Sequence, residues 1–304
     1  MIKQSVFVVK IFGGLGNQMF QYAFARALSL EKSVPFAMDV SWFKTQIDTS
    51  TLDGPDKREY LLDRFNIVEK YSGDGGSTLA HWVSKTPSVG LMLKNLGPVL
   101  NRVIPLEITE SDFETKIRKI SGNGTVLLQG YWQDYNYFWA HNDVIAKDFT
   151  LRRGVTDENR QYLEQIRSSN SVSVHVRRGD ALKPFARKFY AMASMDYFVN
   201  AASLVHGKIH QPTFFVFSND IKWVKANFEI DFPVIFIESD GPDYEHLYLM
   251  SRCKNNIIDI STFSWWAAWL NDNPSKIVIA PEQWVANPDD YHVTIPESWL
   301  RLKN

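Results

Sequence analysis

The strongest constraint on the fold is an alternation along the chain. Short runs rich in β-branched and aromatic residues alternate with segments whose apolar residues recur at helical spacing. This alternation is typical of α/β proteins, in which helices cover a mostly parallel sheet. The expected strands are Ser5–Phe12, Pro35–Val40, Thr125–Gly130, Val172–Val176, Thr213–Phe217, Val234–Glu238, Asn256–Ile260 and Ile277–Ala280. The expected helices are Gln18–Leu30, Asp157–Ser168, Met195–His206, Tyr244–Cys253 and Ser264–Asn271.

The length of the chain indicates two domains. It has 304 residues, and an average domain has roughly 150. A polar stretch, Arg152–Ser171, separates two strand-rich halves. We therefore place the first domain at 1–155 and the second at 156–304.

Charge and composition limit what the protein binds. The chain has 33 Lys and Arg against 34 Asp and Glu, a formal net charge of -1. A whole-protein electrostatic grip on nucleic acid is therefore not expected, and any anion site must be local. Aromatic residues make up 14% of the chain, and the excess of Trp favours stacking on a sugar or an interface. The histidines lack metal-ligand spacing and there is no D-x-D triplet, so we expect no metal centre.

Cysteine usage and hydropathy indicate the compartment. The single cysteine, Cys253, can form neither an internal disulfide nor a cysteine metal cage, which fits a reducing environment. No apolar run approaches the roughly 18 residues of a membrane helix. The segment Val6–Phe12 is interrupted by Lys10 and is interpreted as a strand rather than a signal peptide. We expect a soluble cytoplasmic protein.

A glycine loop follows the first expected strand. A strand, glycines and then a helix present backbone N–H groups and the positive helix end to an anion. Gly14 and Gly16 match the first two glycines of the dinucleotide fingerprint, but Met19 stands at the third, while Asp39 imitates its ribose-binding acid. A nicotinamide or flavin site therefore stays open. The alternative is a tight turn that needs glycine, with Asn17 as the helix cap.

A pair of arginines directly follows the strand Val172–Val176. Arg177 and Arg178 are followed by Gly179 and Asp180. Because side chains alternate along a strand, one arginine can face a ligand while the other braces the loop through Asp180. The planar guanidinium suits bidentate binding of phosphate. The alternative is a purely structural Arg–Asp pair.

Hydroxyl groups follow another expected strand. Ser261, Thr262 and Ser264 lie where the N–H groups of a helix N-terminus are unsatisfied, which is again an anion-binding arrangement. Trp265 and Trp269 share one face of that helix. Such a face is more often core packing than a sugar platform.

Taken together, these motifs resemble a known family. They resemble the bacterial α-1,2-fucosyltransferases of glycosyltransferase family 11, in the right order from Gly13 to about Trp284. The matching segments are Gly13–Ala23, Gly130–Gln133, His175–Asp180, Phe217–Asp220, Leu247–Ser251 and Phe263–Trp266.

The resemblance implies an α/β fold of the GT-B type, in which two Rossmann-like domains face each other across a cleft. It implies inverting transfer of L-fucose from GDP-β-L-fucose to the 2-hydroxyl of a galactoside, without metal or cofactor. The first domain would lie on the acceptor side, and the second would bind the nucleotide sugar. The expected partners are GDP-fucose and a galactose-containing oligosaccharide or lipid-linked glycan. No nucleic acid is expected, and any membrane contact would be peripheral.

The resemblance also assigns roles to residues. Arg177 would contact the diphosphate and stabilise charge on the departing GDP, as a divalent metal does in other transferases. The catalytic candidates are Arg177, Asn17 and Asp180. The donor-binding candidates are Gly14, Gly16, His175, Arg178, Ser218, Asp220, Ser261, Thr262, Phe263 and Ser264.

Two departures from the family pattern lie in the second domain. His246 follows Glu245 where the family often has an acidic residue, and Asp259–Thr262 replaces the common Ala-Asn-Ser-Ser. The general base is not identified; Asp39, Asp134 and Glu245 are the candidates by position.

Other functions also stay open. They are transfer of another nucleotide sugar on the same scaffold, non-catalytic binding of a glycan or nucleotide, and nicotinamide-dependent oxidoreduction. The intact Arg177–Arg178 pair argues against a simple lectin, which needs no diphosphate grip. Loops that shape the acceptor site are expected within residues 41–120.

Overall fold

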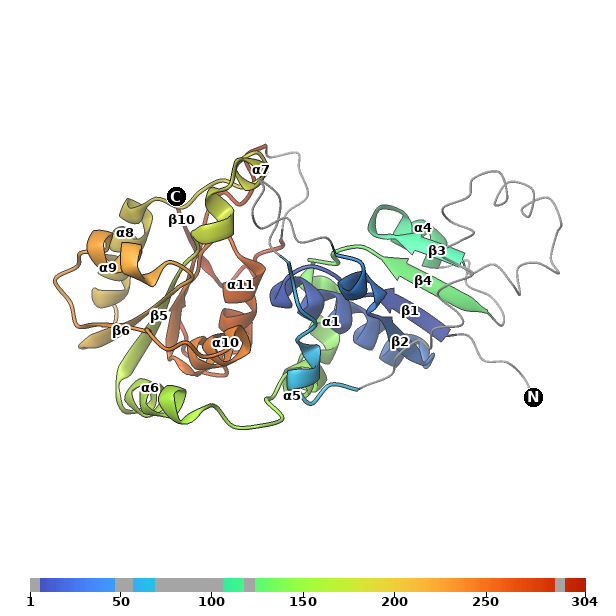
Figure 1. The fold of residues 1–304 in the computed structure, drawn as a ribbon, viewed down its shortest axis with the longest axis horizontal. Coiled ribbons are helices and arrows are strands. Elements are labelled where there is room, and N and C mark those ends of the chain that lie inside the picture. Colours follow the sequence, from blue (N-terminus) through green and yellow to red (C-terminus); the bar gives the residue numbers. More distant parts are fainter. Residues whose placement is uncertain (1–5, 47–56, 69–105, 118–123, 288–292) are drawn as a thin grey trace. The chain divides into compact units, whose positions relative to one another are not determined.

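The computed structural model describes residues 6–46, 57–68, 106–117, 124–287 and 293–304 (Figure 1). The chain forms two compact units that meet in the sequence between Thr150 and Leu151. The sequence pattern placed this boundary after residue 155. Residues 69–105, a large part of the region expected to carry acceptor-shaping loops, lie outside the described residues, as does Ser5 of the first expected strand.

The first unit is built on a four-stranded parallel sheet with the order β2-β1-β4-β3. Helix α1 (Leu15–Lys32) packs on β1 and β2, and most of its residues up to Leu28 are buried. The strand order reverses beside β1, so the topological switch point lies between β1 and β4. The strands are β1 (Val6–Lys10), β2 (Phe36–Asp39), β3 (Leu106–Thr109) and β4 (Thr125–Gln129).

The second unit contains a six-stranded parallel sheet with the order β10-β9-β8-β5-β6-β7. This is the doubly wound order of a Rossmann-like domain, and its switch point lies between β5 and β8. The strands are β5 (Asn170–Val176), β6 (Pro212–Ser218), β7 (Val234–Phe236), β8 (Asn255–Ile257), β9 (Val278–Pro281) and β10 (Leu300–Leu302).

Helices connect the strands in both units. The remaining α-helices are α4 (Phe113–Lys116), α5 (Asn142–Asp148), α6 (Asp157–Ser168), α7 (Pro184–Arg187), α8 (Met195–His206), α9 (Ile221–Asn227), α10 (Asp243–Arg252) and α11 (Thr262–Trp269). The 3₁₀ turns are η1 (Ser41–Lys44), η2 (Leu62–Arg64), η4 (Glu110–Asp112), η6 (Tyr135–Tyr137), η7 (Trp139–His141) and η8 (Gly179–Leu182). None of the helices that the structure describes is long and apolar enough to cross a membrane.

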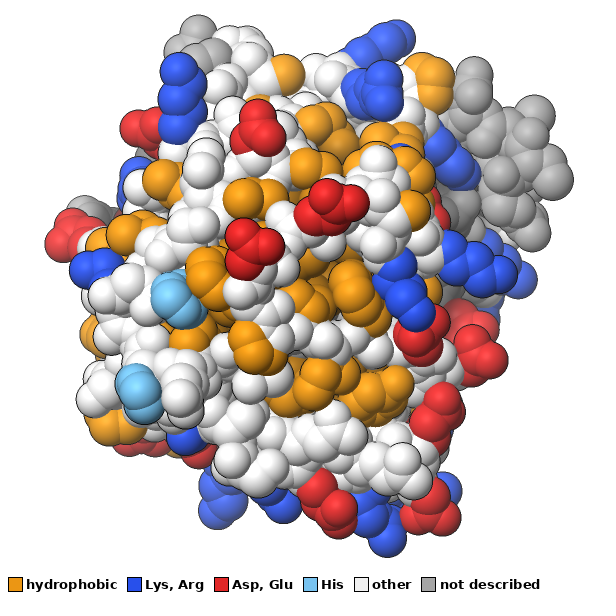
Figure 2. Space-filling model, turned by 90° about the vertical axis from the view of Figure 1, so that its left-hand side faces the viewer, with side chains coloured by type: hydrophobic (Ala, Val, Ile, Leu, Met, Phe, Trp, Pro, Cys, Tyr) orange, Lys and Arg blue, Asp and Glu red, His pale blue; other side chains and the backbone are white. Residues whose placement is uncertain are grey.

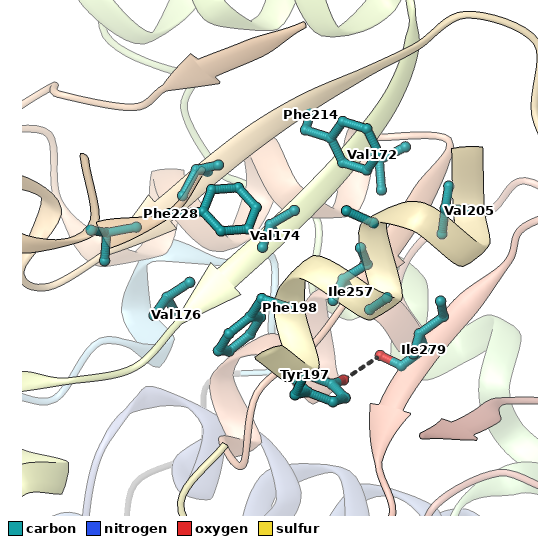
Figure 3. Close-up of a cluster of buried hydrophobic side chains, with 14 residues drawn as sticks. Val172, Val174, Val176, Tyr197, Phe198, Val205, Phe214, Phe228, Ile257 and Ile279 are labelled. Carbon is teal, nitrogen blue, oxygen red and sulfur yellow. Dashed lines mark hydrogen bonds between the residues drawn. The ribbon is translucent and has the colours of Figure 1, made fainter. Parts of the chain in front are cut away.

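Strand β5 is the centre of the second unit's core and is buried on both faces. Its valines form one face and pack with Tyr197 and Phe198 of α8 (Figure 3). The Tyr197 hydroxyl donates to the carbonyls of Ile258 (2.8 Å) and Ile279 (3.3 Å), which ties α8 to the chain at β8 and β9. The core therefore fixes the strands whose ends carry the expected donor site.

Hydrophobic residues next to this core extend to the edge of the sheet. Phe232, Val234 and Phe236 pack against the core while remaining partly exposed. They belong to or precede β7, an edge strand. Figure 2, viewed from the side on which α8 and α9 lie in Figure 1, shows hydrophobic side chains among charged ones at the surface.

The α/β class and all expected strands are confirmed, with shifted ends. Helix α1 begins at Leu15 rather than Gln18, because the extended Gly14 (φ −72°, ψ 169°) is its N-cap. Helix α11 begins at Thr262 rather than Ser264, because Ser261 caps it. Strands β3 and β10 and helices α4, α5, α7 and α9 were not expected.

Candidate functional site

The switch point of the second unit brings Arg177 beside the chain that follows β8. The backbone N–H of Arg177 donates to Asp259 Oδ2 (2.6 Å), and its Nη1 donates to the Ile260 carbonyl (3.2 Å). Its guanidinium carbon lies 5.3 Å from the ring centroid of Tyr190. Ligands of open α/β sheets bind beyond the carboxyl ends of the strands at this point. The positively charged guanidinium of Arg177 is therefore held where that rule places a ligand.

Arg178 points to a different neighbour. Its Nε lies 3.3 Å from Asp220 Oδ2, and its guanidinium carbon lies 3.2 Å from the centroid of Trp223. Its backbone N–H donates to Asn219 Oδ1 (2.9 Å). Arg178 thus braces the loop against the start of α9. The expected brace was Asp180, whose side chain lies outside those that the structure describes, so that pairing stays a prediction.

Ser218 and Asp220 have structural roles at the end of β6. The Asp220 N–H donates to Ser218 Oγ (3.0 Å), and Asp220 Oδ1 accepts from the N–H of Trp223 (3.4 Å), which caps α9. Asp220 also pairs with Arg178. Because these oxygens already bind protein groups, the structure gives both residues a support role, and contact with a donor stays a prediction for them.

The N-terminus of α11 lies after β8, as the hydroxyl pattern predicted. Ser261 Oγ accepts from the N–H of Phe263 (3.3 Å) and caps the helix. Ser264 is buried, and its hydroxyl lies 3.3 Å from the Asp259 N–H and 3.2 Å from the Ser261 carbonyl. Thr262 and Phe263 are partly exposed. The helix end and these two residues are therefore better placed for a ligand than Ser264.

His175 lies on β5 two residues before Arg177 and is buried. Its ring centroid lies 5.6 Å from that of Phe263. His175 therefore packs beneath the first turn of α11.

The tryptophans of α11 pack on one another, and two of the three are buried in the core. Trp265 and Trp266 are fully buried, and Trp265 stacks on Trp269 with a centroid distance of 6.3 Å. The indole N–H of Trp265 donates to the carbonyl of Thr294 (3.1 Å). The core interpretation of this face is confirmed.

The first unit has its own loop at the β1–β4 switch point. Gly13 has a positive φ of 80°, and a Cβ there would lie 2.8 Å from Asn17 Nδ2, so this position requires glycine. A Cβ on Gly14 would meet nothing within 4 Å. Asn17 is not the helix cap, because the N-cap is Gly14; its Oδ1 instead accepts from Gln133 Nε2 (2.9 Å). Gly16 is buried within the first turn of α1.

Two buried glutamines hold this loop, and neither was among the expected site residues. Gln18 donates to the carbonyls of Gly13 (3.0 Å) and Glu59 (2.8 Å). Gln21 accepts from the Phe12 N–H (3.0 Å), and its Nε2 lies 3.4 Å from the Gly130 carbonyl. Gln21 thus joins the ends of β1 and β4. The available signal was two amides on the buried face of an otherwise apolar helix.

The three candidates for the general base differ in environment. Glu245 is buried, and its Oε2 accepts from Thr156 N (2.9 Å), Thr156 Oγ1 (2.8 Å) and Asn159 Nδ2 (2.8 Å). It anchors the start of α6 to α10, and this buried position does not suit a base for an acceptor hydroxyl. Asp39 accepts from the Ser41 N–H (2.9 Å), and Asp134 caps η6; both are partly exposed.

The departure at His246 also belongs to this buried network. Its Nε2 lies 2.9 Å from Ser239 Oγ, which donates to Asn159 Oδ1 (2.7 Å). Burial lowers the pKa of His246, against the raising effect of Asp243 and Glu245. A neutral imidazole therefore completes the contact between α10 and the loop after β7. The described residues hold no group of three or more His, Cys, Asp or Glu that could bind a metal ion.

Comparison with known proteins gives the family. The model of glycosyl transferase family 11 matches residues 108–299. The chain belongs to glycosyltransferase family 11. It is 31% identical to an alpha-1,2-colitosyltransferase of Escherichia coli, over 98% of this chain and 99% of the relative. It is 32% identical to the O-antigen biosynthesis glycosyltransferase WbnK of Escherichia coli, over 95% and 98% of the two chains.

More distant similarity reaches the fucosyltransferases. Galactoside alpha-(1,2)-fucosyltransferase 1 of Leontocebus fuscicollis is 26% identical over 59% of this chain and 55% of its own. A crystal structure of NodZ alpha-1,6-fucosyltransferase with GDP is similar with a TM-score of 0.49 and 14% identity, over 88% and 92% of the chains. The resemblance to family 11 that the motifs indicated is confirmed.

Proposed function

We propose that this family 11 glycosyltransferase moves L-fucose from GDP-β-L-fucose to the 2-hydroxyl of a galactoside, with inversion and without a divalent metal. The observation that carries the proposal is the position of Arg177. Its side chain is held at the β5–β8 switch point, beside the N-terminus of α11. A nucleoside diphosphate needs positive charge and N–H donors, and this place offers both.

The proposed chemistry follows from the charge of the leaving group. Breaking the bond between the sugar and the phosphate leaves negative charge on the departing GDP. A guanidinium already in place strengthens its contact as that charge develops, and so it lowers the barrier. The positive end of α11 adds to the same effect. These groups supply the charge stabilisation for which other transferases use a metal.

The acceptor side of the reaction is assigned to the first unit. An inverting attack needs a base for the proton of the acceptor hydroxyl. Asp39, the last residue of β2, and Asp134, which follows β4, are partly exposed carboxylates. The open space around Gly14 and the amide of Asn17 suit close approach of a polar group. We assign these residues to the transfer step and the second unit to nucleotide binding.

A colitosyl donor is the second candidate. It is favoured by the alpha-1,2-colitosyltransferase that is similar to this chain along almost its whole length. The groups assigned to the diphosphate serve either donor, because they lie on the nucleotide side of the bond that breaks. The choice between the two sugars therefore depends on residues that contact the sugar ring.

A donor screen by mass spectrometry tests this function. The protein is incubated with a β-galactoside and with GDP-fucose, GDP-colitose or GDP-mannose, and the mass gained by the acceptor is measured. Gain of a fucosyl mass supports the proposal, and preferential gain of a colitosyl mass supports the second candidate. The Arg177→Ala variant is the matched control. Binding of GDP without transfer to any galactoside would contradict a transferase of this specificity.

A further inference from the structure

A buried carboxylate lies directly under Arg177. Asp259 follows β8, and 5% of its surface is exposed. Its Oδ2 accepts from the backbone N–H of Arg177 at 2.6 Å, and its Oδ1 accepts from the N–H of Ile260 at 2.7 Å. A buried carboxylate is costly unless donors such as these satisfy it. Both oxygens of Asp259 therefore have defined structural partners.

Asp259 connects β5 to β8 where their backbone pairing has ended. The last paired residues of the two strands are Val174 and Ile257. Beyond them, the carboxylate takes the place of a backbone acceptor for Arg177. On its other side, the Asp259 N–H lies 3.3 Å from Ser264 Oγ, in the first turn of α11. Asp259 thus contacts the two elements that would hold the diphosphate.

We propose that Asp259 is a positioning residue of the donor site, whose ionised carboxylate holds the backbone of Arg177 so that the guanidinium lies at the switch point. This inference rests on the proposed function. Asp259 need not contact the donor, since it acts through Arg177. Loss of one acceptor oxygen would release either the Arg177 or the Ile260 N–H and let the guanidinium leave its place.

The environment of the carboxylate makes this role depend on pH. Burial raises the pKa of Asp259 to about 6, although the N–H groups of Arg177 and Ile260 and the charge of Arg177 act to lower it. From α8, Tyr197 faces it as a neutral phenol, because burial raises the pKa of that hydroxyl. From α11, Ser264 contributes only a hydroxyl. Below about pH 6 a proton on one oxygen therefore removes one acceptor.

The kinetic test compares wild type, Asp259→Asn and a control, Asp148→Asn, between pH 5 and 8.5. Asparagine keeps one acceptor and places an NH2 group at the other, so it imitates the protonated acid. Wild-type kcat should fall below about pH 6. Asp259→Asn should lose this acidic limb and have a kcat at least tenfold below wild type at pH 8, with a smaller change in the KM for the donor.

The control residue is a buried carboxylate of the first unit. Asp148 accepts from Tyr22 Oη (2.7 Å) and Arg26 Nε (2.9 Å). The Asp148→Asn variant loses a comparable buried contact, but its kcat should still fall below about pH 6 as in wild type. If Asp259→Asn also kept that limb, or turned over at the wild-type rate, the positioning role would be overturned.

Hydrogen exchange of the Arg177 amide is the second readout, and it needs no substrate. Loss of a hydrogen bond to a charged group should accelerate exchange about tenfold or more in Asp259→Asn at pH 7.5. In wild type, exchange corrected for pH should accelerate below about pH 6, which tests the idea even if the variant folds poorly. Unchanged exchange in both comparisons would overturn the proposal. Failure of wild type to transfer fucose would count against the proposed function alone.

Discussion

Replacing Arg177 by alanine removes the guanidinium but keeps the backbone N–H, which donates a hydrogen bond to Asp259. The variant loses the hydrogen bond from Nη1 to the Ile260 carbonyl and the contact with the Tyr190 ring. A hydrogen bond contributes about 1 kcal/mol and an exposed cation–π contact about 0.5–1 kcal/mol. The expected loss of stability is therefore about 2 kcal/mol, and a domain stable by about 5–15 kcal/mol stays folded.

The effect on turnover should be larger than the effect on stability. Removal of one preorganised donor from a site of developing negative charge costs about 3–4 kcal/mol, or roughly a hundredfold to a thousandfold in rate. Arg177→Lys keeps a positive charge but loses the planar fork, so we expect an intermediate loss. The order wild type, lysine, alanine in kcat/KM distinguishes this role from simple support of the loop.

The assay is steady-state kinetics with GDP-fucose and a galactoside, beside thermal unfolding by circular dichroism. In Arg177→Ala, any residual activity should also lose the fall in kcat below about pH 6, because Asp259 acts on turnover through the Arg177 guanidinium, which this variant lacks. A folded Arg177→Ala variant with kcat/KM near wild type would remove Arg177 from the mechanism.

Four further outcomes are expected. Activity should survive excess EDTA, and inhibition that added metal reverses would contradict this. Asn17→Ala should lower kcat/KM much more than the affinity for GDP measured by calorimetry, and equal losses would refute the division of roles between the units. Glu245→Gln should keep most of the wild-type turnover. Glu245→Ala should lower the free energy of unfolding by about 3 kcal/mol, because it leaves the Thr156 and Asn159 donors unpaired. Loss of turnover in the glutamine variant would restore Glu245 as a candidate base. Because folding raises the pKa of Asp259 to about 6, its contribution to the unfolding free energy should decline as pH rises from about 4 to 6, and urea titrations of Asp259→Asn should lack this decline.

The central strands of both sheets could be predicted from the sequence because each carries its own local pattern. Strands buried on both faces, such as β5, are continuous runs rich in apolar residues between polar segments. The missed strands β3 and β10 lie at sheet edges, and Leu106 and Leu300 in them are exposed. Both strands are short and mostly exposed, so they carry too little apolar pattern to be predicted, whereas the edge strands β2 and β7 carry more apolar residues and were predicted.

Only the site residues that directly follow a strand could be predicted from the sequence. Arg177, the glycine loop and the hydroxyls of α11 follow strands directly, and so a general rule of α/β sheets locates them. The partners of these residues come from distant parts of the chain. Asp259 is 82 residues away from Arg177, and Asp220 is 42 residues away from Arg178. Only the order of the strands brings such pairs together, and the sequence alone does not give that order.

The central claim is that the switch point of the second unit holds the diphosphate of the donor. A crystal structure of the protein with GDP tests it most directly. The diphosphate should lie within hydrogen-bond distance of the Arg177 guanidinium and beside the first turn of α11, with Arg178 still paired to Asp220. GDP bound elsewhere, with no phosphate oxygen near Arg177, would contradict the account.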